Sequence, residues 1–418
     1  MFGQNGSRPS LDELVRHGAR WARRHGTAAA ATAAAQPDRL SDVSGFGSDP
    51  GNLRMRVYLP ADLPAGAPLV VALHGCTQTA AGYDAGCGWS ALAERHGFAL
   101  LLPEQRRENN PKTCFNWFEP GDAARGAGEA LSIRQMIGHL LDTHKLDPRR
   151  VFISGLSAGG AMTAVMLATY PELFAGGAII AGLPFGAATS VPQAFEAMFQ
   201  GRTQPARSWG DLVRGASPHR GPWPAVSVWH GDADATVKPV NAEESLKQWR
   251  DVLGLPEQPD ASEQVGSHLR RVWRGRDGRA VLESHAIAGM GHGVPVYPGE
   301  GPGRGGAAGP FILDVGVSST HMIAESWGLL RDGEAAAPHP AAARPAPGRS
   351  SAGGPRVIEV GPDGEVRVDP PRPAQAEAPH RPAAGAGTGA GTDRRAPGPL
   401  DPGAVIRKAL QAAGLLRP

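Results

Sequence analysis

The stretch that decides the fold is Val151-Phe152-Ile153-Ser154-Gly155-Leu156-Ser157-Ala158-Gly159-Gly160. A β-branched and aromatic run enters the pattern Gly-x-Ser-x-Gly, and a helical segment rich in Ala and Met follows at once. Between a strand and a helix, this pentapeptide predicts a nucleophile elbow, a tight turn that presents its serine at the start of the helix. Side chains two residues before and two after the serine would collide in such a turn, which explains Gly155 and Gly159. Ser157 is therefore the candidate nucleophile.

Strand and helix patterns alternate on both sides of this turn, from about residue 53 to residue 330. Short runs rich in β-branched residues predict strands at 53–59, 69–73, 98–102, 151–154, 177–181, 226–229 and 281–287. Apolar residues at helical spacing predict helices at 89–96, 128–144, 158–169, 243–253 and 320–329. Alternation of this kind predicts an α/β fold, in which a mostly parallel, doubly wound sheet carries helices on both faces.

Length and composition predict one large domain with additional segments. The chain of 418 residues is long for a single domain, and its 41% apolar and 6% aromatic content suits a globular core. A net charge of +2 gives no reason to expect a nucleic-acid partner. Three cysteines are too few for a disulfide-dense secreted scaffold.

Composition also suggests three parts along the chain. Residues 1–45 read as a loosely structured leader, residues 46–330 as the α/β domain, and residues 331–418 as a disordered tail. No Phe, Trp or Tyr follows Trp327, and the tail is rich in Ala, Pro and Gly, so it cannot bury enough apolar surface to offset its ordering entropy. Within it, 356–368 alternates like a strand and 405–416 resembles a short helix. Each is either a docking segment for a protein or polymer, or solvated tail.

A serine nucleophile needs a base, and the base needs an acid that fixes its tautomer. After the strand at 226–229 the spacing His-Gly-x-x-Asp-x-x-Val favours Asp234 as the acid; Asp232 more simply forms a turn or a helix cap. After the last strand, Gly289-Met290-Gly291-His292-Gly293 places His292 in a loop between glycines, where it can approach the serine. The expected triad is Ser157, Asp234 and His292; His230, His285 and His321 are expected to be structural.

The tetrahedral intermediate requires two backbone donors, an oxyanion hole. The N–H of Ala158, directly after the nucleophile, is the first. The strand at 69–73 runs into His74-Gly75-Cys76, where this fold supplies its second donor, so we assign it to the N–H of Cys76. We expect His74 to be a scaffold residue of the loop.

Taken together, these pieces resemble the polyhydroxybutyrate depolymerase family of esterases, which is related to feruloyl and acetylxylan esterases. The resemblance spans about residues 52–330 and rests on Leu73-His74-Gly75-Cys76-Thr77-Gln78, Tyr83-Asp84-Ala85-Gly86-Cys87-Gly88-Trp89, Leu102-Pro103-Glu104-Gln105, Cys114-Phe115-Asn116-Trp117-Phe118, the serine pentapeptide, and the segments of Asp234 and His292. It implies an α/β-hydrolase fold, a serine esterase mechanism and short-chain hydroxyalkanoate polyesters or oligomers as substrates. The alternatives are feruloyl or acetyl esters of polysaccharide, peptide bonds, and a non-catalytic scaffold that binds a polymer or a protein.

Two further features lie near the predicted site. Cys114 follows the strand at 98–102, so its loop should lie near Cys76; a Cys76–Cys114 disulfide and two buried thiols are equally open interpretations. Phe115, Trp117 and Phe118 place aromatic rings beside the site, where they either grip an aliphatic ester chain or pack in the core. An insertion at about 184–224 lies at the position of a lid.

The sequence suggests no cofactor and no metal, because it contains no His-x-x-x-His pair, no Cys-x-x-Cys pair and no phosphate loop. The long uncharged stretch at 173–195 is interrupted by Pro184 and Pro192, which favours a buried strand and loop over a membrane span. The compartment stays open. The resemblance implies an extracellular protein, whereas the lack of a readable signal peptide favours the cytoplasm.

Overall fold

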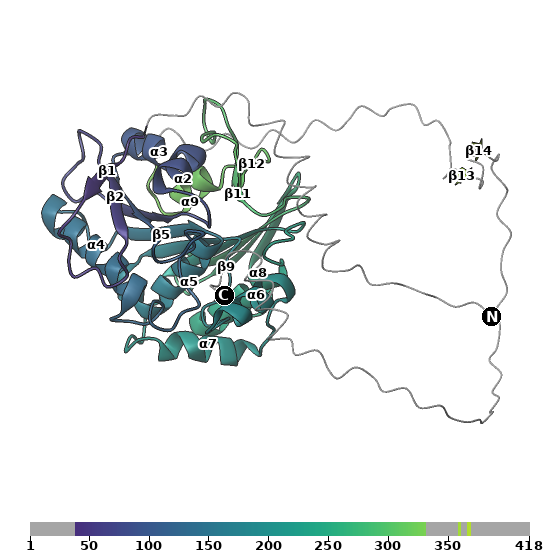
Figure 1. The fold of residues 1–418 in the computed structure, drawn as a ribbon, viewed down its shortest axis with the longest axis horizontal. Coiled ribbons are helices and arrows are strands. Elements are labelled where there is room, and N and C mark those ends of the chain that lie inside the picture. Colours follow the sequence, from purple (N-terminus) through teal and green to yellow (C-terminus); the bar gives the residue numbers. More distant parts are fainter. Residues whose placement is uncertain (1–37, 332–357, 361–365, 369–418) are drawn as a thin grey trace. The chain divides into compact units, whose positions relative to one another are not determined.

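A ten-stranded sheet forms the centre of the computed structural model, which describes residues 38–331, 358–360 and 366–368 (Figure 1). The spatial order of its strands is β1-β2-β4-β3-β5-β6-β7-β10-β9-β8. Their bounds are β1 Ser41–Val43, β2 Arg54–Tyr58, β3 Leu69–Leu73, β4 Ala99–Glu104, β5 Val151–Leu156, β6 Gly176–Ile180, β7 Ala225–Gly231, β8 Ala261–Val265, β9 His268–Arg274 and β10 Ala280–Ile287. A small parallel pair, β11 Val294–Val296 and β12 Ile312–Asp314, lies outside this sheet.

The six central strands, β4, β3, β5, β6, β7 and β10, are parallel, and antiparallel strands extend the sheet at both sides. In this register Leu156 pairs with Ile180, Ile180 with Trp229, and Trp229 with His285. The carboxyl ends of β5, β7 and β10 therefore reach the same edge of the sheet. An open parallel sheet places its site at this edge.

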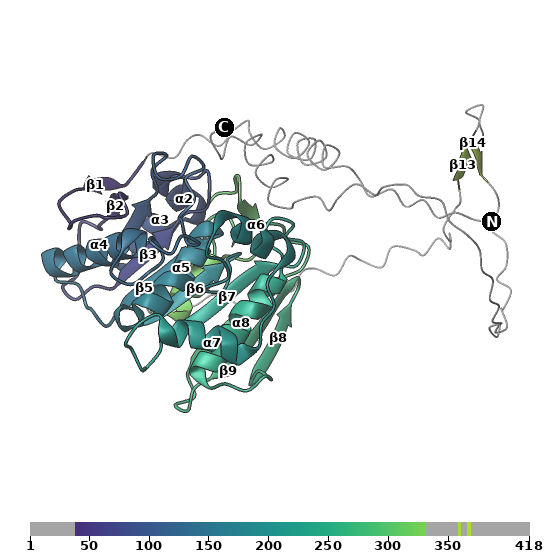
Figure 2. The ribbon, with the colours of Figure 1, turned by 60° about the horizontal axis from the view of Figure 1, so that its bottom comes forward.

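Helices cover both faces of the sheet (Figures 1 and 2). One face carries α4 Gly128–His144, α5 Ala158–Thr169, α6 Val191–Gln200, α7 Ala206–Gly215 and α8 Val240–Leu253, and the other carries α2 Ala80–Cys87, α3 Trp89–His96 and α9 Ser319–Ser326; a short 3-10 turn, η1, spans Pro171–Leu173. Each face has its own apolar core. Alternate residues of β3 enter the two cores, with Leu69, Val71 and Leu73 on one side and Val70 and Ala72 on the other.

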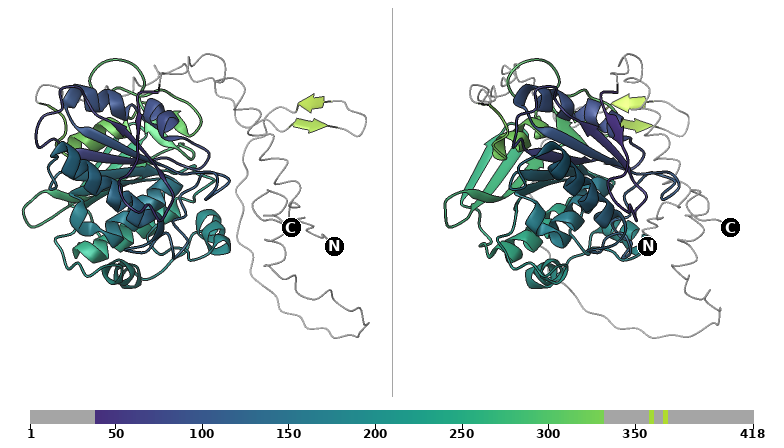
Figure 3. Two further views of the ribbon diagram at one scale, coloured as in Figure 1. Left: turned by 60° about the vertical axis from the view of Figure 1, so that its left-hand side comes forward. Right: turned by 90° about the vertical axis from the view of Figure 1, so that its left-hand side faces the viewer.

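This architecture confirms the predicted α/β-hydrolase-type fold, and every predicted strand from 53–59 to 281–287 is present with small shifts of its ends. The structure adds elements that the sequence patterns did not indicate. β1 pairs with β2, so the sheet begins inside the segment expected to be a leader. The insertion at 184–224 forms α6 and α7, which pack on the same core as α8 (Figure 2). Figure 3 shows the sheet from two further directions, with helices on both of its faces.

The tail contains one described element, an antiparallel pair of β13 Ile358–Val360 and β14 Val366–Val368. The region 356–368 was expected to alternate like a strand, and its two strand segments fall within that range. The predicted helix at 405–416 lies outside the described residues. The α/β domain and the segment from Pro340 onward form separate units.

An ion pair between Arg270 on β9 and the buried Glu283 on β10 leads to a prediction about stability. Burial alone would raise the pKa of Glu283, but hydrogen bonds from His285 and Arg270 lower it from 4.5 to about 2. This contribution to stability is complete above pH 4.5 and is lost as the pH falls from 4.5 toward 2, because only the unfolded chain then gains the proton. We expect Glu283→Gln to lower the free energy of unfolding at pH 7 by about 2–3 kcal/mol.

Urea denaturation at pH 7 and at pH 3 checks this prediction, and the deficit of the variant should shrink at pH 3. Glu257→Gln is the control, because Glu257 is an exposed carboxylate without an ion pair among the described residues and should change the free energy by less than about 0.5 kcal/mol. A deficit of equal size at both pH values would contradict the electrostatic explanation.

Candidate active site

The predicted turn between β5 and α5 has the backbone of a nucleophile elbow. Ser157 adopts φ 57° and ψ −116°, a conformation that L-residues seldom adopt. Its N–H donates to the Ile180 carbonyl at 2.9 Å, and its own carbonyl accepts from Ala161 N–H at 2.8 Å. These bonds fix the strained residue between β6 and the first turn of α5. The serine side chain is thereby held at the carboxyl edge of the sheet.

The two glycines of the pentapeptide are required by close backbone contacts. A Cβ atom on Gly155 would lie 2.3 Å from the Gly159 carbonyl oxygen, and one on Gly159 would lie 2.4 Å from the Leu73 carbonyl oxygen. Contacts this short are not tolerated by backbone atoms. The second contact also shows that α5 begins directly against the end of β3, which leads into the predicted oxyanion loop.

His292 and Asp234 come together from the loops after β10 and β7. His292 Nδ1 donates to Asp234 Oδ2 at 2.7 Å, and the His292 side chain is 8% exposed. Because Nδ1 carries the hydrogen, Nε2 is left as the basic nitrogen, which is the tautomer that a general base requires. The structure thus brings together two of the three residues predicted as a triad through a direct bond.

The loop that carries Phe311 connects His292 to the serine side of the site. The Phe311 ring lies 6.0 Å from the His292 ring, and the neighbouring Pro310 carbonyl accepts from Gln78 Nε2 at 3.3 Å. Gln78 in turn accepts from Gly75 N–H at 2.9 Å, and Gly75 lies against Leu156, the residue before the nucleophile. His292 and Ser157 therefore lie at the same sheet edge. Within the proposed triad, the hydrogen bond between His292 and Asp234 is formed. The hydrogen bond between a catalytic serine and its histidine often tightens only when substrate binds.

The carboxylate of Asp234 is held by several donors. Oδ1 accepts from the N–H groups of Thr236 and Val237 at 2.8 and 2.9 Å, and Oδ2 lies 3.3 Å from His230 Nε2 as well as bonding to His292. Burial alone would raise the pKa of Asp234, but hydrogen bonds from His230, His292 and Val237 bring it well below its usual range. Asp234 is therefore ionised throughout the neutral range, as an acid that orients histidine must be.

The competing aspartate has a different position. Asp232 Oδ1 accepts from Gly289 N–H at 2.6 Å, which ties the turn after β7 to the loop that precedes His292. Asp232 therefore supports the histidine loop, in line with the turn-forming role that its position suggested. Asp234, which the sequence spacing favours as the acid, is the aspartate that bonds to His292.

The oxyanion loop leaves the predicted backbone donor available. Among the described residues the N–H of Cys76 has no acceptor, while its neighbour Thr77 donates to the Lys112 carbonyl. The N–H of Ala158 is at the first position of α5, where the helix supplies no acceptor of its own. Within the described part of the chain neither N–H donates to an acceptor, so both stay candidates for the oxyanion hole.

His74 and a disulfide brace this loop. His74 Nδ1 donates to the Gly75 carbonyl at 2.8 Å and Nε2 accepts from Gln105 N–H at 3.1 Å; burial lowers the pKa of His74, so the ring is neutral. Cys76 and Cys114 form a disulfide across a sequence separation of 38 residues. Of the two open interpretations of these cysteines, the structure contains the bonded one. Cys87 is a buried free thiol.

Glu129 at the start of α4 anchors the other side of the disulfide. It is completely buried and accepts from Gln105 Nε2 at 2.5 Å and from Asn116 N–H at 2.8 Å. Burial and the nearby charge of Asp122 raise the pKa of Glu129 to about 8. Gln105 also donates to the Cys114 carbonyl at 3.1 Å, so this polar cluster connects His74 to the disulfide.

The aromatic residues expected to bind substrate are mostly core residues. Phe115 has no exposed surface and packs on the His74 ring at 5.0 Å, so it supports the oxyanion loop, and the expectation of a substrate contact is corrected for this residue. Trp117 is 6% exposed and Phe118 is half-buried. Phe311, which was not among the expected site residues, is 40% exposed beside His292. Its left-handed φ of 62° is unusual for an aromatic residue, but no sequence pattern indicates it.

The second histidine on Asp234 leads to a prediction about turnover. His230 Nε2 donates to the Val237 carbonyl at 2.8 Å and also faces Asp234 Oδ2, so His230→Leu removes a donor from the carboxylate. Asp234 is then held by one donor fewer and orients the His292 imidazole less firmly. We expect kcat/KM for p-nitrophenyl butyrate to fall about tenfold.

His230→Gln is the matched variant, because the amide nitrogen of Gln can donate from nearly the same position. Both variants leave in place Asp232, which accepts from Gly289 N–H of the histidine loop. The kcat/KM of His230→Gln should stay within about twofold of the wild type. An unchanged kcat/KM in His230→Leu would show that His230 only packs.

Residues 38–331 and the two tail strands contain no cluster of three or more His, Cys, Asp or Glu side chains suited to a metal ion. In the same residues no helix combines the length and the apolar character needed to cross a bilayer.

The chain is similar in sequence and in fold to known esterases and to a depolymerase. The family described as esterase PHB depolymerase matches residues 53–268. The poly(3-hydroxyalkanoate) depolymerase C of Paucimonas lemoignei is 50% identical over 292 residues, which cover 70% of this chain and 70% of that protein. Feruloyl esterase B of Thermothelomyces thermophilus is 36% identical over 52% of this chain and 76% of its own. Among solved structures, an acetyl xylan esterase from Aspergillus awamori matches with a TM-score of 0.57 and 29% identity, over 60% of this chain and 93% of that one.

Proposed function

Since the chain belongs to the esterase PHB depolymerase family and is a carboxylic ester hydrolase, we propose that its substrates are short-chain hydroxyalkanoate polyesters or their oligomers. The observation that carries the proposed site is the 2.7 Å bond from His292 to Asp234, at the sheet edge where Ser157 is held in its strained turn. The identity of 50% to a poly(3-hydroxyalkanoate) depolymerase supports the choice of substrate.

In the proposed reaction, Ser157 Oγ attacks the ester carbonyl carbon while its proton passes to His292 Nε2. The N–H groups of Cys76 and Ala158 hold the oxyanion of the tetrahedral intermediate. The bond from carbon to the alcohol oxygen then breaks, and the alcohol leaves with the proton from His292. A water molecule, deprotonated by His292, adds to the acyl-enzyme, and the second collapse releases the acid and restores Ser157. Asp234 keeps its charge throughout.

Phe311 is proposed as a contact for the aliphatic part of the substrate. Its ring is exposed next to His292, and the Pro310–Gln78 bond holds its loop on the oxyanion side of the site. We expect Phe311→Ser to raise KM for hydroxybutyrate oligomers by about tenfold, because a lost aromatic contact costs about 1–2 kcal/mol, and to leave kcat nearly unchanged. Phe199→Ser, an exposed aromatic residue on α6, is the control. A fall in kcat without a rise in KM would contradict the assignment.

A substrate panel tests the proposed function. A fluorophosphonate probe should first label Ser157, which separates an active serine hydrolase from a non-catalytic scaffold. The protein is then assayed on 3-hydroxybutyrate oligomers, amorphous polyester film, methyl ferulate and acetylated xylan. We expect the highest kcat/KM on the hydroxybutyrate oligomers. Preference for methyl ferulate or acetylated xylan would favour the second candidate, a carbohydrate esterase, to which the similarity with feruloyl and acetyl xylan esterases points.

A further inference from the structure

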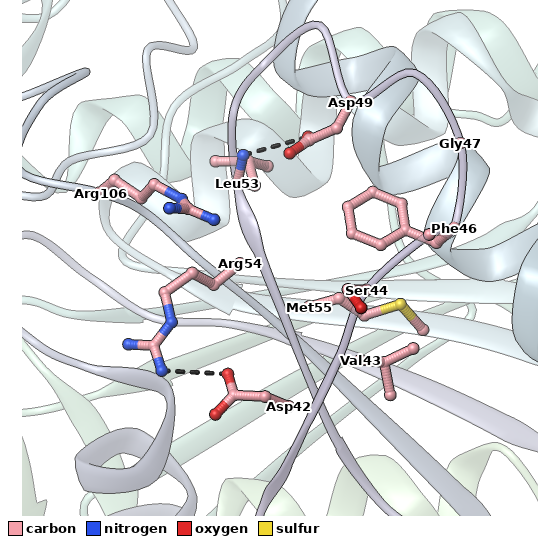
Figure 4. Close-up of a pocket in the computed structure, with 11 residues that line it drawn as sticks. Asp42, Val43, Ser44, Phe46, Gly47, Asp49, Leu53, Arg54, Met55 and Arg106 are labelled. Carbon is pink, nitrogen blue, oxygen red and sulfur yellow. Dashed lines mark hydrogen bonds and ion pairs between the residues drawn. The ribbon is translucent and has the colours of Figure 1, made fainter.

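A cavity of about 350 Å³ lies beside β1 and β2, and none of the proposed triad residues lines it (Figure 4). Its walls come from the loop that joins β1 to β2 and from the segment after β4. The volume is at the lower end of the range for sites that bind small molecules. The side chains that line it show which kind of molecule it suits.

Arg106 brings an uncompensated positive charge to the cavity. Its main-chain N–H donates to Gln105 Oε1 at 2.9 Å, but its buried Nε has no hydrogen-bond partner, and no ion pair with a described carboxylate is present. A guanidinium group carries five donors, and a buried donor without an acceptor is costly. A ligand with anionic oxygens would remove this cost.

The other charged groups of the cavity are already engaged. Arg54 pairs with Asp42 at 3.0 Å and with Glu104 at 2.6 Å. Asp49 is turned toward the backbone, where Oδ1 accepts from Leu53 N–H at 3.1 Å (Figure 4). Arg106 is therefore the lining cation with no carboxylate of its own among the described residues.

The opposite wall is apolar. Figure 4 shows Arg54 and Arg106 on one side of the view and Val43, Phe46 and Met55 on the other. Phe46 is half-buried, so part of its ring remains available. One cation facing an apolar wall suits a molecule with a single negative end and a short aliphatic body.

We propose that this cavity binds a small aliphatic carboxylate, with its oxygens on the Arg106 guanidinium and its alkyl part against Phe46. The choice of carboxylate rests on the proposed function, because hydrolysis of a hydroxyalkanoate ester releases an acid of this shape that is ionised at neutral pH. The free acid and the carboxyl end of an oligomer share this chemistry. A carboxylate on Arg106 lies one residue from Gln105, which supports the oxyanion loop through His74 and Cys114.

Isothermal titration calorimetry with sodium 3-hydroxybutyrate tests the site on the full chain. We expect the wild type to bind with Kd of about 1 mM and Arg106→Gln to bind at least about tenfold more weakly. Arg107→Gln is the matched control, because Arg107 is exposed and does not line the cavity. The neutral 3-hydroxybutyramide should not bind. Equal binding by Arg106→Gln and the wild type, or no binding by the wild type up to about 20 mM, would overturn the proposal.

A second titration distinguishes the two sources of the carboxylate. A linear trimer with a free carboxyl end and its methyl ester are titrated into Ser157→Ala, which prevents cleavage. Tighter binding of the free trimer than of the monomer identifies the chain end as the ligand, and weaker binding identifies the free acid. Both arginine variants should hydrolyse p-nitrophenyl butyrate within about twofold of the wild type. Absence of hydrolysis in all three proteins would refute the proposed function. The calorimetric comparison of Arg106→Gln with the wild type would still decide the proposed carboxylate site.

Discussion

Ser157→Ala is expected to lower kcat for p-nitrophenyl butyrate by at least about four orders of magnitude, because no other group in the proposed site can form the acyl-enzyme. The residual rate should be the small acceleration that a site retains through its oxyanion donors and substrate binding when the nucleophile is removed. Steady-state kinetics with the purified variant provide the measurement. The fluorophosphonate probe should no longer label the protein.

Ser154→Ala is the matched control for this prediction. Ser154 is on β5, three residues before the nucleophile, and its buried hydroxyl has no hydrogen-bond partner in the described structure. Its removal should leave kcat within about twofold and the melting temperature nearly unchanged. A Ser157→Ala protein that is folded and retains more than a tenth of the wild-type rate would be incompatible with Ser157 as the nucleophile.

The sequence was sufficient for the sheet core and for the elbow, because both rest on local patterns. β3 is a continuous run of apolar residues and β5 is interrupted by Ser154 alone among polar residues, a pattern typical of strands buried on both faces. The elbow is specified by Gly155 and Gly159, whose missing side chains correspond to contacts of 2.3 and 2.4 Å. The order of Ser157, Asp234 and His292 along the chain then placed each residue after a strand of the same sheet.

The strands β8 and β9 and the helices α6 and α7 could not be predicted in this way. β8 is almost entirely exposed, so its residues show no buried face, and it is held by pairing with β9. α6 and α7 are ten-residue helices that contain Pro192 and Gly210, two residues with poor intrinsic helix propensity. Tertiary contacts, and not local preference, stabilise these elements.

The contacts that tune the site were also beyond the reach of sequence patterns. His230 faces Asp234 because the turn after β7 folds back, with Asp234 N–H donating to the Gly231 carbonyl at 3.2 Å. Phe311 reaches His292 only through the pairing of β12 with β11. Phe115 is adjacent to the disulfide in sequence, yet its ring turns into the core. Proximity along the chain indicates the region, and packing decides which aromatic side chains are exposed there.

Asp234→Asn is expected to lower kcat by about four orders of magnitude, nearly as much as loss of the nucleophile. Asn presents an amide in place of the Oδ2 that accepts from His292 Nδ1 at 2.7 Å. Because an amide N–H in that position would favour hydrogen on Nε2, the imidazole would then lack the lone pair that removes the serine proton. The rate of fluorophosphonate labelling should fall with kcat, which shows that the attack of Ser157 is the affected step.

Asp232→Asn is the decisive comparison, since the two aspartates are two residues apart and equally conservative to replace. The carbonyl oxygen of Asn can still accept from Gly289 N–H, the 2.6 Å bond that Asp232 makes to the histidine loop. Its kcat should therefore stay within about fivefold of the wild type. The reverse pattern, a severe loss in Asp232→Asn and a mild one in Asp234→Asn, would mean that His292 exchanges its partner during turnover. Asp232 would then be the acid, and the Asp234 contact a feature of the resting enzyme.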